Sequence, residues 1–234
     1  MTVGTGRPVV GSLLSYLAPA DRDFLLGRGV SRTLPANTAL MHEGDPTDHV
    51  LVLRSGWVRV YSSTKDGQVV LFALRGPGDV IGDLAALQPD WTRTGTVETL
   101  QRIAFTQFRI EEFFACLHDR PAVAIALLRQ MTVRLRDAEA ARVDFATLDV
   151  AQRVAALLVR LIDMHGRVEE AGLVLRWPLT QQDIADRIGA SRRAVARALA
   201  TLRERHIVTT GRHLYVVTAP DVLRLFAGIV PNGT

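Results

Sequence analysis

The chain has 234 residues, which is enough for two domains that each bury a hydrophobic core. Lys and Arg together number 28 against 24 Asp and Glu, for a formal net charge of +4, and Lys65 is the only lysine. Between Arg176 and His213 eight arginines face three acids, a net of +5, so the rest of the chain carries about −1. The basic character is confined to the C-terminal part, as in a protein with one anion-binding domain.

Cys116 is the only cysteine. This count excludes an internal disulfide, a cysteine-ligated iron–sulfur cluster within one chain and a cysteine-rich zinc site. We interpret Cys116 as a small buried apolar residue. The N-terminal stretch has neither a long apolar core nor a basic start, and no window approaches membrane-spanning length. We therefore expect a soluble cytoplasmic protein with no membrane partner.

The sequence pattern of the N-terminal half changes from helical to strand-rich near residue 35. Residues from about Ser12 to Leu34 predict a short helical lead-in, in which Pro19–Ala20–Asp21 opens a helix. Residues 35–107 then alternate short β-rich runs with glycine-bearing turns, which is typical of a small antiparallel barrel or jelly roll. The predicted strands are Ala39–Met41, His49–Leu53, Trp57–Ser62, Val69–Leu74 and Thr96–Ala104.

A long helix follows the strands. From Pro121 to about Leu148 no internal glycine or proline interrupts the chain. Residues recur at alternating intervals of four and three, the spacing of a coiled-coil seam, at Ala124, Leu128, Met131, Leu135, Ala138, Arg142 and Phe145. We expect a parallel homodimer through residues 121–148. Because one seam position is Arg142, a single amphipathic helix lying on its own barrel is the alternative.

The C-terminal part predicts a winged domain. Asp149 caps a helix over Val150–His165. Further on, Ile207–Thr209 and Leu214–Val217 predict a two-stranded wing around a turn at residues 210–212. A short helix over Asp221–Phe226 is expected after the wing.

Between these parts, the stretch Leu179–Arg205 predicts two short helices joined by a tight turn at Gly189–Ala190. Thr180 and Asp183 are spaced as a capping box for the first helix, and Ser191 is placed to cap the second. Such a hairpin is typical of a DNA-binding element whose second helix enters the major groove.

The second helix is amphipathic. Its apolar residues fall on one face, while Arg192, Arg193 and Arg197 are expected to project elsewhere and reach base edges or phosphates. The alternative for this segment is a surface hairpin whose arginines are only solvated charge.

The order of barrel, long helix and winged helix-turn-helix resembles the cyclic-AMP receptor/fumarate-nitrate regulator (Crp/Fnr) family of bacterial transcription factors. Residues 78–84 followed by 93–97 are similar to the phosphate-binding cassette of that family, residues 147–150 match its hinge, and residues 191–197 match the start of its recognition helix. The resemblance covers nearly the whole chain.

The resemblance implies an α+β fold with an N-terminal cyclic-nucleotide-binding-type β-roll (1–118), a long dimerisation helix (119–148) and a C-terminal winged helix-turn-helix (149–234). It implies a sequence-specific regulator that binds double-stranded DNA as a homodimer, works with RNA polymerase and is not an enzyme. Occupancy of the barrel would shift the dimer helix near Leu135–Phe145 and rotate the winged domains about Thr147–Asp149.

The cassette also makes chemical sense from its residues. Gly82 lets the backbone approach an anion, and Arg93 and Thr94 can bind a phosphate through charge-assisted and hydroxyl hydrogen bonds. We assign no cofactor with certainty, and a cyclic nucleotide is the candidate ligand. The alternative is an effector-independent protein with an empty or vestigial pocket, in which Arg93 pairs with an acid such as Asp83 or Asp90.

Two departures from the cyclic-AMP binder concern the ligand. Asp83 stands where that protein has a glutamate for the ribose hydroxyl, and Ala138 and Glu139 replace the threonine and serine that read adenine. A buried unpaired carboxylate is costly, so either Glu139 points to solvent or pairs with an arginine, or the native effector is not cyclic AMP. We hypothesise that cyclic AMP binds weakly or not at all. The implied ligand-binding set is Gly82, Asp83, Leu84, Arg93, Thr94, Ala138 and Glu139.

One departure concerns DNA. The implied DNA-binding set is Thr180, Gln182, Ser191, Arg192, Arg193 and Arg197. Arg193 replaces a glutamate that accepts a hydrogen bond from cytosine in the family, and a guanidinium has no acceptor to offer. We therefore expect a half-site that differs from the usual one.

Three other function classes make demands that the sequence does not clearly meet. A haem sensor would need an axial ligand such as His42, His49 or His118. A cupin-like metalloprotein would need clustered ligands, and His42, Glu43 and His49 lack that spacing. A ligand-binding adaptor that never touches DNA would leave the three arginines of the second helix unexplained. We expect no metal site and no catalytic residues.

Overall fold

The structure is a computed structural model that describes residues 6–88, 90–176, 178–211 and 213–229. It divides into two compact units, Met1–Leu135 and Arg136–Thr234. In chain order the first unit contains η1 (Leu13–Tyr16), α1 (Pro19–Gly27), β1 (Val30–Leu34), β2 (Ala39–Met41), β3 (His49–Ser55), β4 (Val58–Ser63), β5 (Val69–Arg75), β6 (Val80–Ile81), α2 (Asp83–Leu87), β7 (Thr96–Thr99), β8 (Ile103–Arg109), α3 (Ile110–Asp119) and the first part of α4 (Pro121–Thr147).

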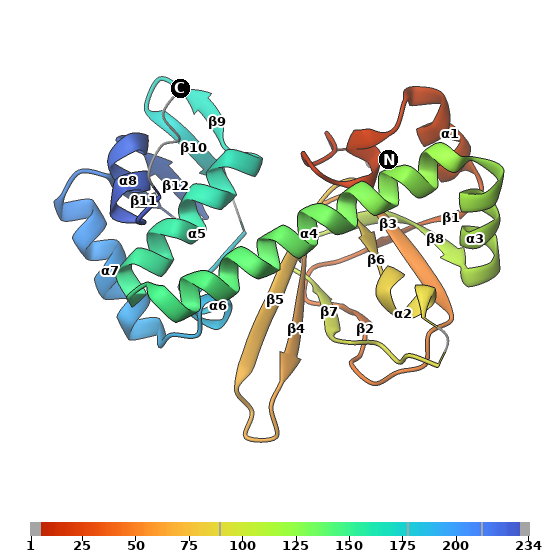
Figure 1. The fold of residues 1–234 in the computed structure, drawn as a ribbon, viewed down its shortest axis with the longest axis horizontal. Helices are drawn as coiled ribbons and strands as arrows, with labels where there is room; N and C mark the ends of the chain where they lie inside the picture. The colour runs from red at the N-terminus through yellow and green to blue at the C-terminus, as the bar shows by residue number, and fades with distance from the viewer. Residues whose placement is uncertain (1–5, 89, 177, 212, 230–234) are drawn as a thin grey trace. The chain divides into compact units, whose positions relative to one another are not determined.

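The strands of the first unit form two antiparallel sheets, in the orders β1-β8-β3-β6 and β2-β7-β4-β5. Figure 1 shows them facing each other as a β-roll, with the β4–β5 hairpin extending from it. Gly67 makes the turn of this hairpin with φ +78°, a conformation that glycine adopts without strain. The predicted barrel is confirmed.

Two predictions for the first unit, one of a strand and one of a helix, were wrong in detail. The single run Thr96–Ala104 is two strands, because a turn at residues 100–102 sends β7 and β8 into different sheets. The last residues of the helical lead-in form β1 instead, since Val30–Leu34 pairs with β8 along its whole length. Most of β1 is exposed, so no alternation of apolar and polar residues marked it as a strand.

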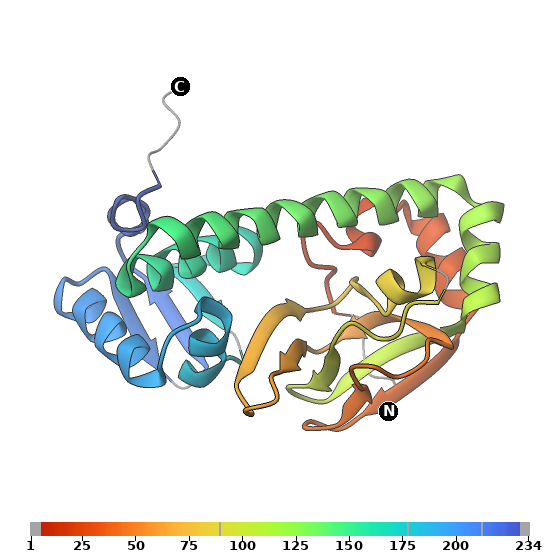
Figure 2. The same cartoon turned by 60° about the horizontal axis from the view of Figure 1, so that its bottom comes forward.

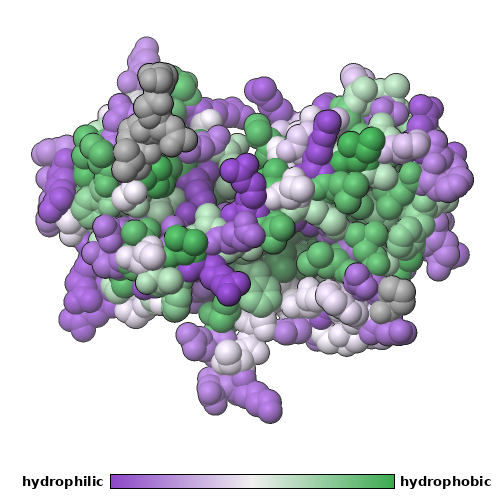
Figure 3. All heavy atoms as spheres, viewed as in Figure 1, coloured by the Kyte–Doolittle hydropathy of each residue, from purple (hydrophilic) through white to green (hydrophobic). Residues whose placement is uncertain are grey.

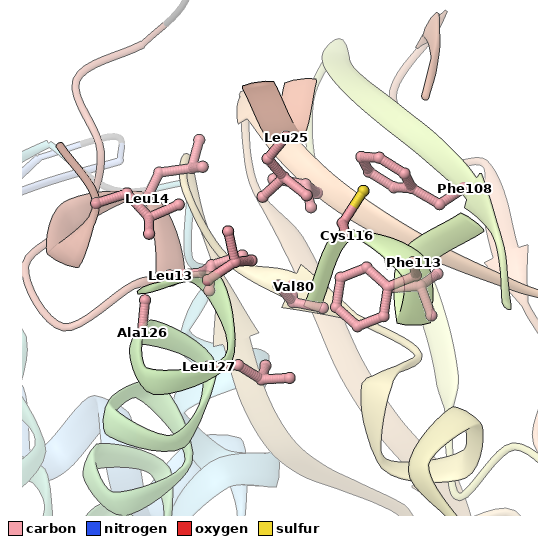
Figure 4. Packing of buried hydrophobic residues seen from close by; sticks show 13 residues of the cluster. Leu13, Leu14, Leu25, Val80, Phe108, Phe113, Cys116, Ala126 and Leu127 are labelled. Carbon is pink, nitrogen blue, oxygen red and sulfur yellow. The ribbon is translucent and has the colours of Figure 1, made fainter. Parts of the chain in front are cut away.

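Two apolar clusters hold the first unit together. One lies inside the roll and contains Leu51, Leu53 and Phe105. The other packs the outer face of β3 and β8 against η1, α1, α3 and α4, as Figure 4 shows for Phe108, Cys116 and their neighbours. Cys116 is fully buried, as predicted, and burial raises the pKa of its thiol.

The long helix is confirmed as α4, drawn as one unbroken helix in Figures 1 and 2. One face packs on the roll through Val123, Ala126 and Leu127. Large apolar side chains remain exposed elsewhere on the helix, and green surface is visible over its first part in Figure 3. These exposed residues are Ile125, Leu128, Leu135, Val143 and Phe145.

The second unit begins within α4, at Arg136, and then contains α5 (Val150–His165), β9 (Arg167–Glu169), β10 (Gly172–Arg176), α6 (Gln181–Ile188), α7 (Arg192–Glu204), β11 (Val208–Gly211), β12 (Leu214–Val217) and α8 (Pro220–Phe226). Its strands form one antiparallel sheet in the order β11-β12-β10-β9. The predicted wing is therefore part of a four-stranded sheet. Of the predicted wing turn, Arg212 lies outside the described residues.

The α+β fold class expected from the sequence is confirmed by this order of β-roll, long helix and winged helix-turn-helix. Among the described residues, no helix combines the length and hydrophobicity needed to cross a membrane.

Candidate anion pocket and DNA-binding surface

A cavity of about 80 Å³ lies in the first unit where β6 and α2 meet the segment before β7. Its lining includes five of the seven residues proposed to bind a ligand: Gly82, Asp83, Leu84, Arg93 and Thr94. These residues come from two segments that are separate in the sequence, so the β-roll brings them together.

Gly82 allows the close approach of backbone and side chain in this cavity. Its φ is +82°, in the left-handed region that favours glycine. A Cβ at this position would lie 2.4 Å from Nη1 of Arg93 and 2.9 Å from Cε of Met41. Glycine is therefore required here both by backbone conformation and by space.

Arg93 is buried between backbone carbonyls. Its Nη2 donates to the His49 carbonyl oxygen at 2.7 Å, and its Nη1 donates to the Gly82 carbonyl oxygen at 3.2 Å. Burial lowers the pKa of the guanidinium, while Asp48 and Asp45 oppose this shift. Its acidic partner is Asp48, at 3.5 Å, and is neither of the two acids named as candidates from the sequence.

Asp83 is paired with an arginine from α4 that was missed in the sequence. Nη1 of Arg134 donates to Oδ2 of Asp83 at 2.7 Å, and Nη2 donates to the carbonyl oxygen of Val80 at 2.5 Å. Asp79 adds a second carboxylate 3.6 Å from Arg134. Helical periodicity could have pointed to Arg134, because it lies one turn before Ala138 and so shares a face of the helix with it.

Ala138 and Glu139 are placed differently from the other five proposed residues. Both are exposed, both belong to the second compact unit, and neither lines the cavity. Of the two arrangements considered for Glu139, exposure to solvent is the one observed. The ligand set carried over from the family is thus brought together only in part.

The helix-turn-helix of the second unit forms with the predicted caps. The Thr180 hydroxyl accepts a hydrogen bond from the Asp183 backbone N–H at 3.1 Å, and Oδ2 of Asp183 accepts one from the Thr180 N–H at 2.8 Å. Ser191 caps α7 by accepting from the Ala194 N–H at 3.2 Å. The turn uses Gly189 at φ +63°.

The turn also receives a side chain from the end of α4. A Cβ on Gly189 would lie 2.9 Å from Cε2 of Phe145. The Arg153 guanidinium also lies over that ring, 5.0 Å from its centroid. The last turns of α4 are therefore packed against the turn that positions α7.

The exposed face of α7 is basic. Val195, Ala198, Leu199 and Leu202 are buried on its apolar face. All six residues proposed to bind DNA are exposed: Thr180, Gln182, Ser191, Arg192, Arg193 and Arg197. In the described part of the chain none of the three arginines forms an ion pair, whereas the Gln182 amide donates to Asp186 at 2.7 Å.

The described residues contain no group of three or more His, Cys, Asp or Glu side chains that could hold a metal ion. His49 is bound to the adjacent Asp48 carboxylate, and the side chain of His118 is 93% exposed. Neither arrangement favours the cupin-like or haem alternatives.

Comparisons with known proteins agree with this geometry. Residues 31–120 match the family described as a cyclic nucleotide-binding domain, and residues 152–226 match the Crp-like helix-turn-helix domain. The chain is 32% identical over 202 residues to the "CRP-like cAMP-activated global transcriptional regulator" of Mycobacterium tuberculosis, covering 86% of this chain and 84% of the relative. It is 28% identical over 200 residues to the "Cyclic AMP receptor protein" of Thermus thermophilus, covering 85% and 88%.

Among solved structures, a mutant of CooA from Carboxydothermus hydrogenoformans is similar with a TM-score of 0.79, 18% identity and coverage of 94% of this chain and 98% of that chain. At this identity the likeness concerns the fold alone. The Mycobacterium tuberculosis relative is named as a transcriptional regulator, which supports the expectation of a non-enzyme.

Proposed function

The chain belongs to the Crp/Fnr family and is a DNA-binding transcriptional regulator, and from this premise we propose that a small organic anion in the β-roll governs its activity as a homodimer. The observation that carries the proposal is the pair of arginine sites. Arg93 and Arg134 border a cavity in the first unit, and Arg192, Arg193 and Arg197 stand exposed on α7 in the second.

The homodimer is proposed from α4. Leu128 and Leu135 are seven residues apart on the predicted seam, and their side chains are 63% and 60% exposed. A second copy of α4 would bury both, because residues seven apart repeat the same core position of a coiled coil. Such a dimer would place two recognition helices about 34 Å apart, one turn of DNA. RNA polymerase is the further partner that the family suggests.

The proposed effector is a cyclic phosphodiester. Arg93 donates to two neutral carbonyls, and a phosphate would replace them with a stronger charge-assisted partner. The Mycobacterium tuberculosis relative is named as cAMP-activated. Here Asp83 is shorter than the glutamate of cyclic-AMP binders and Ala138 and Glu139 lack hydroxyls, so we propose that cyclic AMP binds weakly and that another member of this ligand class is preferred.

A second candidate is effector-independent DNA binding. The cavity of about 80 Å³ is much smaller than the roughly 300–1,000 Å³ of typical ligand sites. The donors of Arg93 and the carboxylate of Asp83 already have protein partners. Both observations favour a vestigial pocket, and the experiment must separate the two candidates.

The experiment is a genome-wide footprint with purified protein, with and without cyclic mononucleotides and cyclic dinucleotides, together with titration calorimetry of each nucleotide. Specific footprints that strengthen with one nucleotide support effector control, and the same footprints without any nucleotide support the second candidate. Calorimetry that gives micromolar or tighter affinity for cyclic AMP contradicts the proposed weak binding. Binding that is insensitive to salt and sequence would contradict the DNA-binding surface.

A further inference from the structure

A second cavity, of about 400 Å³, opens in the β-roll between β1, β2, β3 and β8. Its described lining residues do not overlap with those of the anion pocket. The volume falls within the range of roughly 300–1,000 Å³ that small-molecule sites occupy. The nucleotide-binding function proposed above does not use this cavity.

The strand register gives the cavity its apolar walls. Arg32 pairs with Phe105 and Leu51 pairs with Gln107, so these four side chains lie on the same face of the sheet. Leu34 follows Arg32 by two residues and shares that face. Leu51 and Phe105 are almost fully buried, so the cavity has a hydrophobic floor.

The polar side of the cavity is cationic. Arg32 is exposed, and within the described residues it has no ion-pair partner. None of the described lining residues is acidic. His49 also lines the cavity, and because its Nδ1 contacts the Asp48 carboxylate, Nε2 is the ring nitrogen left for a ligand. An unpaired guanidinium beside apolar walls matches a carboxylate attached to an apolar body.

We propose that this cavity binds an amphipathic monocarboxylate, with the carboxylate on Arg32 and the hydrocarbon or aromatic part against Leu34, Leu51 and Phe105. The carboxylate is preferred over a phosphodiester because the site has one arginine at an open rim, while the anion pocket holds a buried arginine at its interior.

One residue, His49, connects the two cavities. His49 lines the second cavity, and its backbone carbonyl accepts the hydrogen bond from Arg93 in the anion pocket. A test must therefore show which cavity a carboxylate occupies.

The test is titration calorimetry of the full-length protein with octanoate and phenylacetate, and with octanol and 2-phenylethanol as neutral counterparts of similar size. Both carboxylates are expected to bind with Kd below about 1 mM, and each at least about tenfold more tightly than its alcohol. Absence of binding by both carboxylates at that concentration, or equal binding of acids and alcohols, would overturn the proposal.

Four variants locate the site. Arg32→Gln is expected to weaken carboxylate binding about tenfold or more, because it removes the charge at the rim. Arg102→Gln, a change of another exposed arginine of the same unit that lies outside the cavity lining, serves as the matched control and should bind as the unaltered protein does. Ala39→Phe places a ring at an exposed lining position and should block both carboxylates and alcohols.

The fourth variant, Arg93→Gln, removes the cation of the anion pocket. It is expected to retain carboxylate affinity within about threefold. Loss of binding in this variant with retention in Arg32→Gln would place the ligand in the anion pocket and overturn the proposal. Circular dichroism of each variant confirms that lost binding does not reflect loss of the fold.

Discussion

Asp137 of α4 accepts a hydrogen bond from Nη2 of Arg187 of α6 at 2.8 Å. Arg160 of α5 reaches the same carboxylate at 3.7 Å and Asp144, further along α4, at 2.5 Å. Burial lowers the pKa of Arg187, and Asp137 opposes this shift. Alternating charges thus connect the last turns of α4 to the first helix of the helix-turn-helix, within one compact unit.

The first prediction concerns this connection. Asp137→Asn is expected to lower the free energy of unfolding of the second unit by about 1–2 kcal/mol, because it leaves a largely buried guanidinium without its charged partner. The side chain of Asp137 remains 31% exposed, so solvent moderates the loss. Hydrogen exchange of α6 amides measures the change.

Asp163→Asn is the matched control for that prediction. Asp163 pairs with Arg224 in the same unit, but its side chain is 47% exposed. Its loss should cost less than about 1 kcal/mol. If the two substitutions lower the free energy of unfolding equally, the ion pairs of Asp137 do not stabilise the second unit more than an exposed ion pair does.

The second prediction concerns Gly82. Gly82→Ala is expected to destabilise the first unit by about 2–3 kcal/mol. An alanine is strained at this positive φ, and its methyl group would push Arg93 away from its carbonyl partners. Urea unfolding followed by tryptophan fluorescence measures the loss.

Gly67→Ala separates the cost of backbone strain from the cost of the contact with Arg93. Gly67 has φ +78°, nearly the same as Gly82, but a Cβ there would have no described atom within 4 Å. The substitution should therefore cost only the backbone strain, about 1 kcal/mol. Equal losses at the two glycines would show that the contact with Arg93 is unimportant.

Local features of this fold were predictable because they depend on neighbouring residues. The Thr180–Asp183 box and the Ser191 cap each involve groups three residues apart, and both formed as expected. The ion pairs Arg134–Asp83 and Arg187–Asp137 join residues 51 and 50 positions apart, and only the tertiary structure brings them together.

Two strands of the second unit were not predicted, for a different reason. All residues of β9 are exposed and β10 begins with Gly172, so neither strand shows the alternation that predicts a half-buried strand. Of the ligand positions that the family implies, Gly82 and Arg93 lie together in the cavity because the β-roll fixes their places. Ala138 and Glu139 on α4 are exposed and do not line it.

The third prediction concerns pH. Burial lowers the pKa of His165, at the end of α5, to about 4 from an ordinary value near 6.5. Between these two values the unfolded chain binds a proton that the folded chain does not, so stability falls as the pH decreases through 6.5 toward 4. From pH 7 to pH 5 the second unit should lose about 1–2 kcal/mol from this group.

His165→Gln tests that assignment. The variant should show a shallower decrease in the protection of α5 amides between pH 7 and pH 5, because the titrating group is gone. The comparison is between slopes and not absolute stabilities, so a general weakening by the substitution does not obscure it. Parallel slopes for the two proteins would rule out His165 as the source.

The last prediction concerns base preference. Arg193 is exposed on α7, two residues after the cap residue Ser191, at the end of the helix that would enter the major groove first. A guanidinium donates to guanine or phosphate, whereas a carboxylate accepts from cytosine. Arg193→Glu should therefore shift base preference by roughly 1–3 kcal/mol at one position of each half-site, as measured by selection from a random DNA library.

Arg167→Glu is the control for charge in that selection. It makes the same change of charge on an exposed residue of β9, away from α7, and should weaken binding to all sequences alike without altering the selected site. Replacing an arginine that contacts only phosphate should likewise lower the salt slope by about one without changing the site. Selection of the same half-site by Arg193→Glu and the unaltered protein would mean that Arg193 does not read a base, and the departure from the family pattern at this position would then be without consequence for specificity.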